Sequence, residues 1–190
     1  MTAVPVAQRM TADEFLALPE PHDGRRHELV EGELVVTFPG FLHGAVQAHL
    51  VFTLGKWARA QSGRGIVTLT HGISLDDRNL FGPDILWYRE GRAPGRHDPP
   101  PYSMPDLAVE VRSASTWRYD IGAKKAAYER HGLPELWLVD TAAAEVLVFR
   151  RSAPQGHTFD VALELGRGDT LASPLLPGFA LAIGELYPAE

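Results

Sequence analysis

The stretch Met104–Tyr128, MPDLAVEVRSASTWRYDIGAKKAAY, decides the fold of this chain. Its first half alternates between two faces. Leu107, Val109 and Val111 form an apolar face, and Ala108, Glu110 and Arg112 form the other. This period of two predicts a β-strand. The second face can also be buried, but only if Glu110 has a partner, because a lone buried carboxylate is very costly.

After Ser113 the period changes to that of a helix. Trp117, Ile121 and Tyr128 fall on one side, with Lys124 and Lys125 within or beside that stripe. A strand that ends on an acid, followed by a helix that returns a lysine to it, can build a small charged pocket at the edge of a core.

The flanking sequence predicts a mixed set of helices and strands. Thr11 and Glu14 have capping-box spacing and start a short helix. Glu31-Gly32 separates two strand-like runs and indicates a tight hairpin. Apolar residues at helical spacing predict a long helix from Leu42 to about Gln61. Further strands are expected at residues 66–70, 73–75, 85–88, 136–140, 145–150 and 157–165, with a turn at 76–79 and a surface loop at 89–101.

Composition describes an ordinary globular protein with few special features. The chain has 190 residues, is 45% hydrophobic and 22% charged, and contains no cysteine. Disulfides, thiol nucleophiles and Cys-ligated zinc are therefore excluded. We expect one domain over residues 1–190, with residues 1–10 as a loose lead-in. The sequence shows no membrane-spanning run and no signal peptide, which favours the cytoplasm. A net charge of −6 argues against coating nucleic acid by bulk attraction, although a local basic groove is compatible with it.

Two acids stand at the ends of apolar strands and are the first candidates for chemistry. Asp84 precedes the strand at 85–88, and Glu110 lies near the end of the strand at 107–111. If these strands are neighbours, the two carboxylates meet and either share a proton or bind a cation. Oxygen-only ligands indicate Mg²⁺ or Mn²⁺. The alternative is that Glu110 only forms a buried ion pair with Arg112 or a helix lysine. From pattern alone, Glu28 is a solvated strand residue and His43 a half-buried packing residue of the long helix.

The motifs HELVEGEL, GPDI, PDLAVEVRSAST and DIGAKKAAYERHGLPELWLVD resemble the Uma2 family of endonucleases, within the PD-(D/E)xK nuclease superfamily. The resemblance runs from Thr11 to the closing SPLLPG segment. It implies an α/β (α+β) fold with a restriction-endonuclease-like core, in which helices flank a mixed β-sheet and further β-hairpins are added. It also implies Mg²⁺- or Mn²⁺-dependent hydrolysis of DNA.

The resemblance also implies roles for individual residues. Asp84 and Glu110 would hold the metal, with the carbonyl of Val111 as a further ligand. Glu28 would join the metal or position its water, and Lys124 would orient or activate that water. Arg112 and Lys125 would neutralise the substrate phosphate.

The chain departs from the superfamily pattern in two places. Arg112 occupies the usual lysine position two residues after the glutamate, and arginine is too basic to transfer protons. Lys124 is the expected substitute, while helical geometry leaves Lys125 open. Ala114 replaces a proline of the family's S-P-S motif, which we expect to be a minor backbone change.

Two other interpretations remain open from the sequence. One is a catalytically inactive member that binds nucleic acid or a protein. The other is a purely structural ion pair, with Lys124 bonded to Glu110, at a subunit interface. Nuclease folds of this size often self-associate, so we expect a homo-oligomer in which Trp87, Tyr88 and Tyr102 could line the contact.

Overall fold

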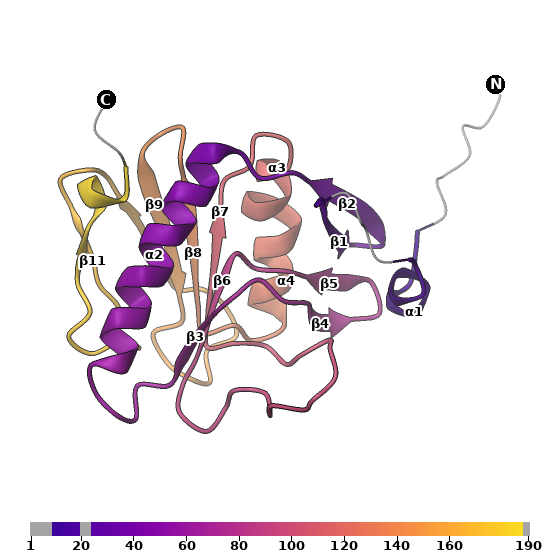
Figure 1. Cartoon of the computed structure of the whole chain (residues 1–190), viewed down its shortest axis with the longest axis horizontal. Coiled ribbons are helices and arrows are strands. Elements are labelled where there is room, and N and C mark those ends of the chain that lie inside the picture. Colours follow the sequence, from indigo (N-terminus) through magenta and orange to yellow (C-terminus); the bar gives the residue numbers. More distant parts are fainter. Residues whose placement is uncertain (1–8, 20–23, 188–190) are drawn as a thin grey trace.

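The computed structural model describes residues 9–19 and 24–187. Most of the predicted lead-in at 1–10 and of the turn at 19–24 therefore lies outside the described residues. Figure 1 shows a central sheet with a long helix in front of it and a second, smaller sheet at its side. The helices are α1 (Ala12–Leu16), α2 (Phe41–Arg59), α3 (Trp117–Tyr119) and α4 (Lys125–Arg130), with a terminal 3₁₀ turn at Ile183–Leu186. The strands are β1 (Arg26–Val30), β2 (Glu33–Thr37), β3 (Ile66–Leu69), β4 (Ile73–Asp76), β5 (Asn79–Phe81), β6 (Ile85–Tyr88), β7 (Leu107–Val111), β8 (Glu135–Asp140), β9 (Glu145–Arg150), β10 (Val161–Leu165), β11 (Thr170–Leu171) and β12 (Leu181–Ala182).

The central sheet has six strands in the order β10-β9-β8-β7-β6-β3. Its β7–β8 pair is parallel and its other pairs are antiparallel. Parallel neighbours need a crossover connection, and here the helical segment Trp117–Arg130 provides it. The mixed α+β architecture with flanking helices predicted from the sequence is confirmed.

Strand β7 is buried on both faces, so the second face, which the sequence allowed in a core only with a partner for Glu110, is also covered. Leu107, Val109 and Val111 pack in one core cluster with α2 and the C-terminal elements. Ala108 belongs to a second cluster, with α4 and the strands of the smaller sheet. Helix α2 and the α3–α4 segment therefore cover opposite faces of the central sheet, and Glu110 lies on the α4 side.

The smaller sheet has the order β2-β1-β5-β4. Its β1–β2 hairpin turns at Glu31 and Gly32, which both have positive φ, at 50° and 79°. A two-residue turn with positive φ at both positions matches the right-handed twist of antiparallel strands. The predicted hairpin is confirmed, as is the capping box of α1.

Three local expectations differ from the structure. The strands expected on either side of residues 71–72 belong to different sheets, because β3 pairs with β6 and β4 pairs with β5. The turn expected at 76–79 is shorter, since Asn79 already begins β5. Trp87 and Tyr88, which the sequence offered as residues that could line an oligomer contact, are both buried, being 4% and 0% exposed.

The helical stripe after β7 also differs from the expectation. Ile121 was predicted to face the core with Trp117 and Tyr128, yet it is 47% exposed. Residues Asp120–Lys124 form a π-helical turn between α3 and α4. A π turn holds more residues than an α turn and so shifts the register of one face. Asp120 and Lys124 take the inward positions instead.

Gly65 fixes the start of the edge strand β3, and replacing it should be costly. It has φ of 74°, and a Cβ atom there would lie 2.0 Å from the backbone oxygen of Tyr88. We expect Gly65→Ala to lower the free energy of unfolding by at least about 3 kcal/mol, from left-handed strain and the backbone clash together. Urea unfolding would measure the loss. Gly63→Ala is the matched control, because Gly63 has φ of 82° with open space around its Cβ position. It should lose only about 1–2 kcal/mol, and equal losses would contradict the packing argument.

Candidate active site

Asp84 and Glu110 come together because β6 and β7 are antiparallel neighbours. Ile85 pairs with Val109, which places Asp84 beside the end of β7. The backbone N–H of Val111 donates to Oδ2 of Asp84 over 2.6 Å. The Asp84 charge also helps to raise the pKa of Glu110, so the two carboxylates interact. The condition that the sequence left open, that the two strands are neighbours, is met.

Strong donors surround the Asp84 carboxylate. Arg26 of β1 donates to Oδ1 over 2.5 Å, and Nε2 of His43 in α2 lies 3.1 Å from Oδ2. Burial alone would raise the pKa of Asp84, but the hydrogen bond with His43, the charge of Arg26 and the N–H of Val111 bring that pKa below its usual value. Asp84 is therefore kept ionised although it is only 1% exposed.

Lys124 is the centre of the buried cluster. Its Nζ lies 2.8 Å from Oε1 of Glu110, 2.9 Å from Oε1 of Glu28 and 3.1 Å from Oδ1 of Asp120. Burial would lower the pKa of Lys124, but the charges of Glu110, Glu28 and Asp120 raise it well above the ordinary value. The side chain is therefore a permanent cation, and it joins β1, β7 and the π turn.

Glu28 is part of this cluster and is not the solvated strand residue that its pattern indicated. It is 5% exposed, and its Oε1 accepts a hydrogen bond from the N–H of Gly82 over 2.7 Å. Both of its oxygens also contact Lys124. The hairpin β1–β2 thus brings an acid from the smaller sheet to the edge of the central one.

Negative charge is in excess at this cluster. Four carboxylates, those of Glu28, Asp84, Glu110 and Asp120, face two permanent cations, Arg26 and Lys124. Two of these acids, Glu110 and Asp120, have raised pKa values, to which burial and the neighbouring carboxylates contribute. Burial raises the pKa of Glu110 to about 8, against the opposing charge of Lys124, and burial raises that of Asp120 to about 6. The site therefore favours either protons or an additional cation.

Stability should depend on pH through Glu110. Its folded pKa is raised above the unfolded value, so the native chain holds a proton that the unfolded chain releases. This contribution to stability is complete below about pH 4.5 and is lost as pH rises through about 8. We expect the free energy of unfolding of the wild type, relative to Glu110→Gln, to fall between pH 5 and pH 8. Urea unfolding in EDTA at three pH values would measure this, and parallel curves for the two proteins would contradict it.

The structure places Arg112 and Lys125 outside the cluster. Arg112 donates to both oxygens of Asp140 at the end of β8, over 2.7 and 2.8 Å. The Nζ of Lys125 lies 4.4 Å from the ring centre of Phe149. Of the two helix lysines, Lys124 is the one that contacts the acids, and its role in catalysis stays a prediction. Contact of Arg112 or Lys125 with a phosphate stays a prediction.

Sequence reasoning missed four members of the cluster. They are Arg26, His43, Asp120 and Tyr128, whose hydroxyl donates to Oε1 of Glu110 over 2.7 Å. Asp120 could have been found from its position four residues before Lys124, a spacing that favours ion pairs. His43 was predicted to be a packing residue, but it contacts Asp84 and its Nδ1 is buried without a hydrogen-bond partner in the described part of the chain.

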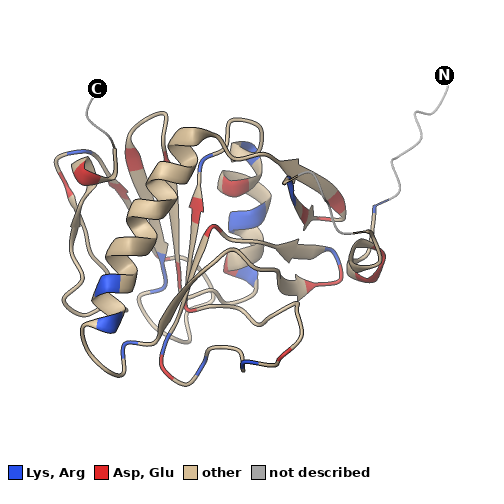
Figure 2. Cartoon of the chain, viewed as in Figure 1, with Lys and Arg blue, Asp and Glu red and all other residues tan. Residues whose placement is uncertain are grey.

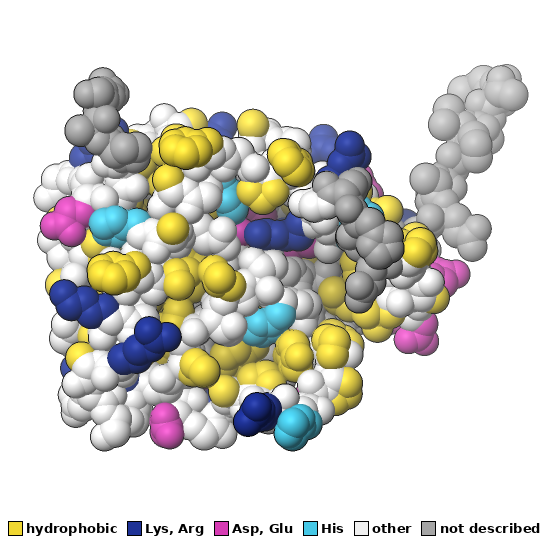
Figure 3. Space-filling model, in the orientation of Figure 1, with side chains coloured by type: hydrophobic (Ala, Val, Ile, Leu, Met, Phe, Trp, Pro, Cys, Tyr) yellow, Lys and Arg dark blue, Asp and Glu magenta, His cyan; other side chains and the backbone are white. Residues whose placement is uncertain are grey.

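The cluster lies between α2 and the smaller sheet, since His43 comes from α2 and Arg26 from β1. In Figure 3, basic and acidic side chains meet in this region, beside one of the visible histidines. The side chain of Arg26 is 22% exposed, whereas that of Lys124 is 2% exposed. Arg26 therefore lies nearer to solvent than the lysine.

The donor set fits a hard divalent cation in type and charge. Asp84 and Glu110 supply carboxylate oxygens, and the carbonyl of Val111 faces the same side of β7 as its N–H, toward Asp84. The arrangement of these side chains in space fits a metal ion less well. Within residues 9–19 and 24–187, no three His, Asp or Glu side chains are grouped so that they could hold a metal ion. Lys124 and Arg26 instead neutralise part of the charge.

The chain is similar to known proteins in sequence and in fold. Residues 12–184 match the Uma2 family model, described as "Putative restriction endonuclease". A crystal structure described as a "putative nuclease belonging to DUF820" from Anabaena variabilis ATCC 29413 superposes with a TM-score of 0.75 and 22% identity. The superposition covers 93% of this chain and 97% of that one, and it shows a shared fold. No curated protein matches the chain. The family match supports a nuclease-like function.

Proposed function

Because the chain belongs to the Uma2 family, we propose that it is a Mg²⁺- or Mn²⁺-dependent endonuclease that hydrolyses phosphodiester bonds of DNA. One observation carries the proposal. Asp84 and Glu110, from two neighbouring strands, lie in a buried cluster with the helix-borne Lys124 at 2.8 Å from Glu110. The structural ion-pair alternative also predicts contact between Lys124 and Glu110. Such a pair would be balanced, whereas this cluster has two more acids than permanent cations, and this excess favours the proposal.

In this proposal the acids of the cluster bind the metal ion, and the permanent cations act on the water and the phosphate. Asp84 and Glu110 would hold the cation, with the Val111 carbonyl as a further ligand. A bound Mg²⁺ or Mn²⁺ would polarise a water molecule and stabilise the charge that develops on the phosphate. Asp84 is ready for this role because His43, Arg26 and the Val111 N–H keep it ionised.

Lys124 acts in this proposal as a fixed positive donor. Its raised pKa means that it does not accept a proton at neutral pH. It would orient the attacking water and Glu110, and it would stabilise negative charge on the phosphate. Glu28 would hold Lys124 in place and could help to position the water. Arg26, partly exposed above Asp84, is placed to meet the incoming phosphate.

The substrate would be recognised locally, since the chain carries a net charge of −6. Within the described residues, no helix has the length and apolarity to cross a bilayer. Location in the cytoplasm and self-association stay predictions.

Plasmid cleavage tests the proposal. Supercoiled DNA is incubated with the protein in Mg²⁺, in Mn²⁺ or in EDTA, and the open-circular and linear products are measured on gels. We expect cleavage with either metal and none in EDTA. If purified, folded protein leaves the plasmid intact across both metals and a range of pH, the inactive DNA- or protein-binding alternative is favoured instead.

A further inference from the structure

A second charged region lies at the opposite end of the central sheet from the acids. Arg89 follows β6, Asp106 precedes β7, and Glu135 and Arg150 are paired at the start of β8 and the end of β9. Strand β7 runs from this end to Glu110, a span of about 13 Å at the usual rise of a strand. Figure 2 shows the acid of β7 near the arrowhead, with basic segments around the other end of the sheet.

A cavity of about 550 Å³ opens at this second region. This volume lies within the usual range for small-molecule sites. Four arginines line the cavity, two from the loop after β6 and two from the end of β9: Arg89, Arg92, Arg150 and Arg151. Such a concentration of guanidinium groups is unexpected in a chain of net charge −6.

Buried Asp106 holds two of these arginines in position. Asp106 is 0% exposed, and its carboxylate accepts from Nε of Arg89 over 2.9 Å and from Arg92 over 2.6 Å. The side chains of these arginines are still 51% and 49% exposed. In the described part of the chain, Arg89 contacts Asp106 through its backbone N–H and Nε, which leaves its two terminal nitrogens for a ligand.

The other two arginines add charge at the opposite wall. Glu135 already accepts hydrogen bonds from Trp137 and Ser173, and Arg150 is 4.0 Å away from it. The guanidinium of Arg150 can therefore bond elsewhere. Arg151 donates to the carbonyls of Leu133, Gly156 and Glu129, so it fixes the wall and keeps its charge.

Four guanidinium groups line the cavity, and the buried carboxylates of Asp106 and Glu135 and the exposed one of Asp160 lie near them. The side chains of Arg89 and Arg92 are about half exposed, so their guanidinium groups can meet a ligand. A phosphate monoester carries about −1.5 to −2 charges at pH 7 and accepts several hydrogen bonds from arginine forks.

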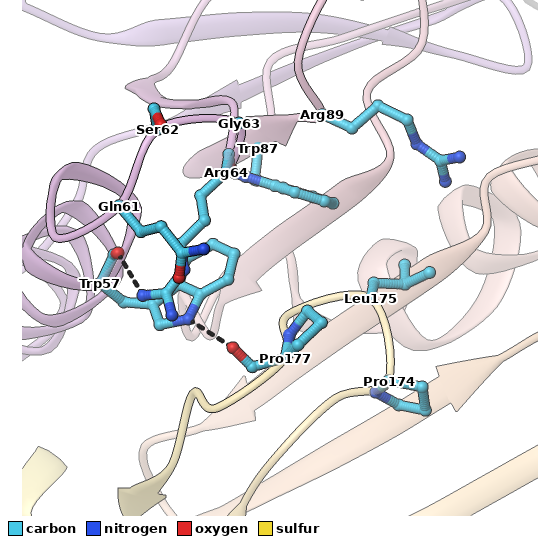
Figure 4. Close-up of a pocket in the computed structure, with 10 residues that line it drawn as sticks. All are labelled: Trp57, Gln61, Ser62, Gly63, Arg64, Trp87, Arg89, Pro174, Leu175 and Pro177. Carbon is cyan, nitrogen blue, oxygen red and sulfur yellow. Dashed lines mark hydrogen bonds between the residues drawn. The ribbon is translucent and has the colours of Figure 1, made fainter.

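An aromatic pocket of about 440 Å³ adjoins this cavity and shares Arg89, Pro174 and Leu175 with it. Its other walls include the edges of Trp57 and Trp87, which are 7% and 4% exposed, and Arg64, whose guanidinium lies 4.8 Å from the Trp57 ring centre (Figure 4). In the figure Arg89 extends away from Trp57, past the Trp87 ring. A group attached to a phosphate in the arginine cavity could therefore rest against apolar walls.

We propose that the arginine cavity binds a phosphate monoester, and that the adjoining aromatic pocket accepts the nucleoside attached to it. The ligand is a free nucleoside monophosphate or the 5′-phosphorylated end of a DNA strand, which share this chemistry. The site is separate from Asp84 and Glu110 and requires no metal.

Calorimetric titration of the full chain in EDTA, at constant ionic strength, tests this site. The probes are inorganic phosphate, dAMP, and one oligonucleotide with and without a 5′-phosphate. We expect saturable binding of dAMP, tighter than that of inorganic phosphate. Preference for the 5′-phosphorylated oligonucleotide over its 5′-hydroxyl form would identify a strand end, and equal, weak binding of both oligonucleotides would identify the free nucleotide. Either result supports the site.

Variants locate the binding. Arg92→Gln and Arg150→Gln should each weaken dAMP binding by at least about tenfold, the loss expected for a charged hydrogen bond. Arg96→Gln is the matched control, because Arg96 is an exposed arginine of the same loop that does not line the cavity. It should leave binding unchanged, and Glu110→Gln should do so too. Absence of saturable dAMP binding to the wild type, or equal losses in Arg92→Gln and Arg96→Gln, would overturn the proposal.

Discussion

Glu110→Gln should reduce metal-dependent DNA cleavage by at least about 100-fold, the scale expected when a group that stabilises the transition state is removed. The substitution preserves the shape of the side chain and its hydrogen bond with Tyr128, while removing the charge that would hold the cation. It also removes a carboxyl group whose burial raises its pKa to about 8, so the variant should fold at least as well at pH 8.

Initial rates of plasmid nicking, with and without Mn²⁺, would measure the loss. Glu164→Gln is the matched control, since Glu164 is an exposed acid of the edge strand β10, which β9 and β8 separate from β7. Its rate should equal that of the wild type. A Glu110→Gln protein that cleaves at the wild-type rate would mean that Glu110 is a structural residue.

Lys124→Met should be the most destabilising change in the cluster. It leaves Glu28, Glu110 and Asp120 buried around an apolar side chain, and losing one partner of a buried ion pair typically costs about 3–5 kcal/mol. We expect this loss of unfolding free energy at pH 8. At pH 5.5 the loss should be smaller, because Glu110 is then protonated and needs no neighbouring cation to balance its charge.

Urea unfolding of the two proteins at both pH values would measure the difference. Lys125→Met is the control, because the neighbouring lysine contacts the ring of Phe149 and none of the acids. Its loss should stay near the ~1 kcal/mol of an exposed cation–π contact. Similar losses for Lys124→Met and Lys125→Met would show that the charge cluster contributes little to stability.

The sequence predicted the central strands and two of the acids for clear physical reasons. Alternation in β7 showed that Glu110 would need a partner if its face of the strand was buried. The positions of Asp84 and Glu110 at strand ends showed that they could meet, but only the antiparallel register of β6 and β7 brings them together. Hydrophobic periodicity shows that a segment is a strand but does not show which other strand it pairs with, so the proximity of Asp84 and Glu110 could be established only from the structure.

The sequence was wrong about one residue next to the site. A regular helical period placed Ile121 inward, and the π turn at Asp120–Lys124 reversed that assignment. Arg112 lies beside Asp140, where the parallel register of β7 and β8 puts it, and its contact with a phosphate stays a prediction. His43 and Arg26 could not be predicted as partners of Asp84 from the sequence. Their contacts depend on how α2 and β1 pack next to Asp84, and the periodicity of these two elements does not determine that packing.

Binding of Mn²⁺ to the protein, its Asp84→Asn and Glu110→Gln variants, and the Glu164→Gln control tests the central claim most directly. Paramagnetic resonance would count the bound ions without any need for cleavage. We expect one ion per chain for the wild type and for Glu164→Gln, with strong loss in Asp84→Asn and in Glu110→Gln. Wild-type binding that is absent, or that survives both substitutions unchanged, would contradict a metal site at Asp84 and Glu110.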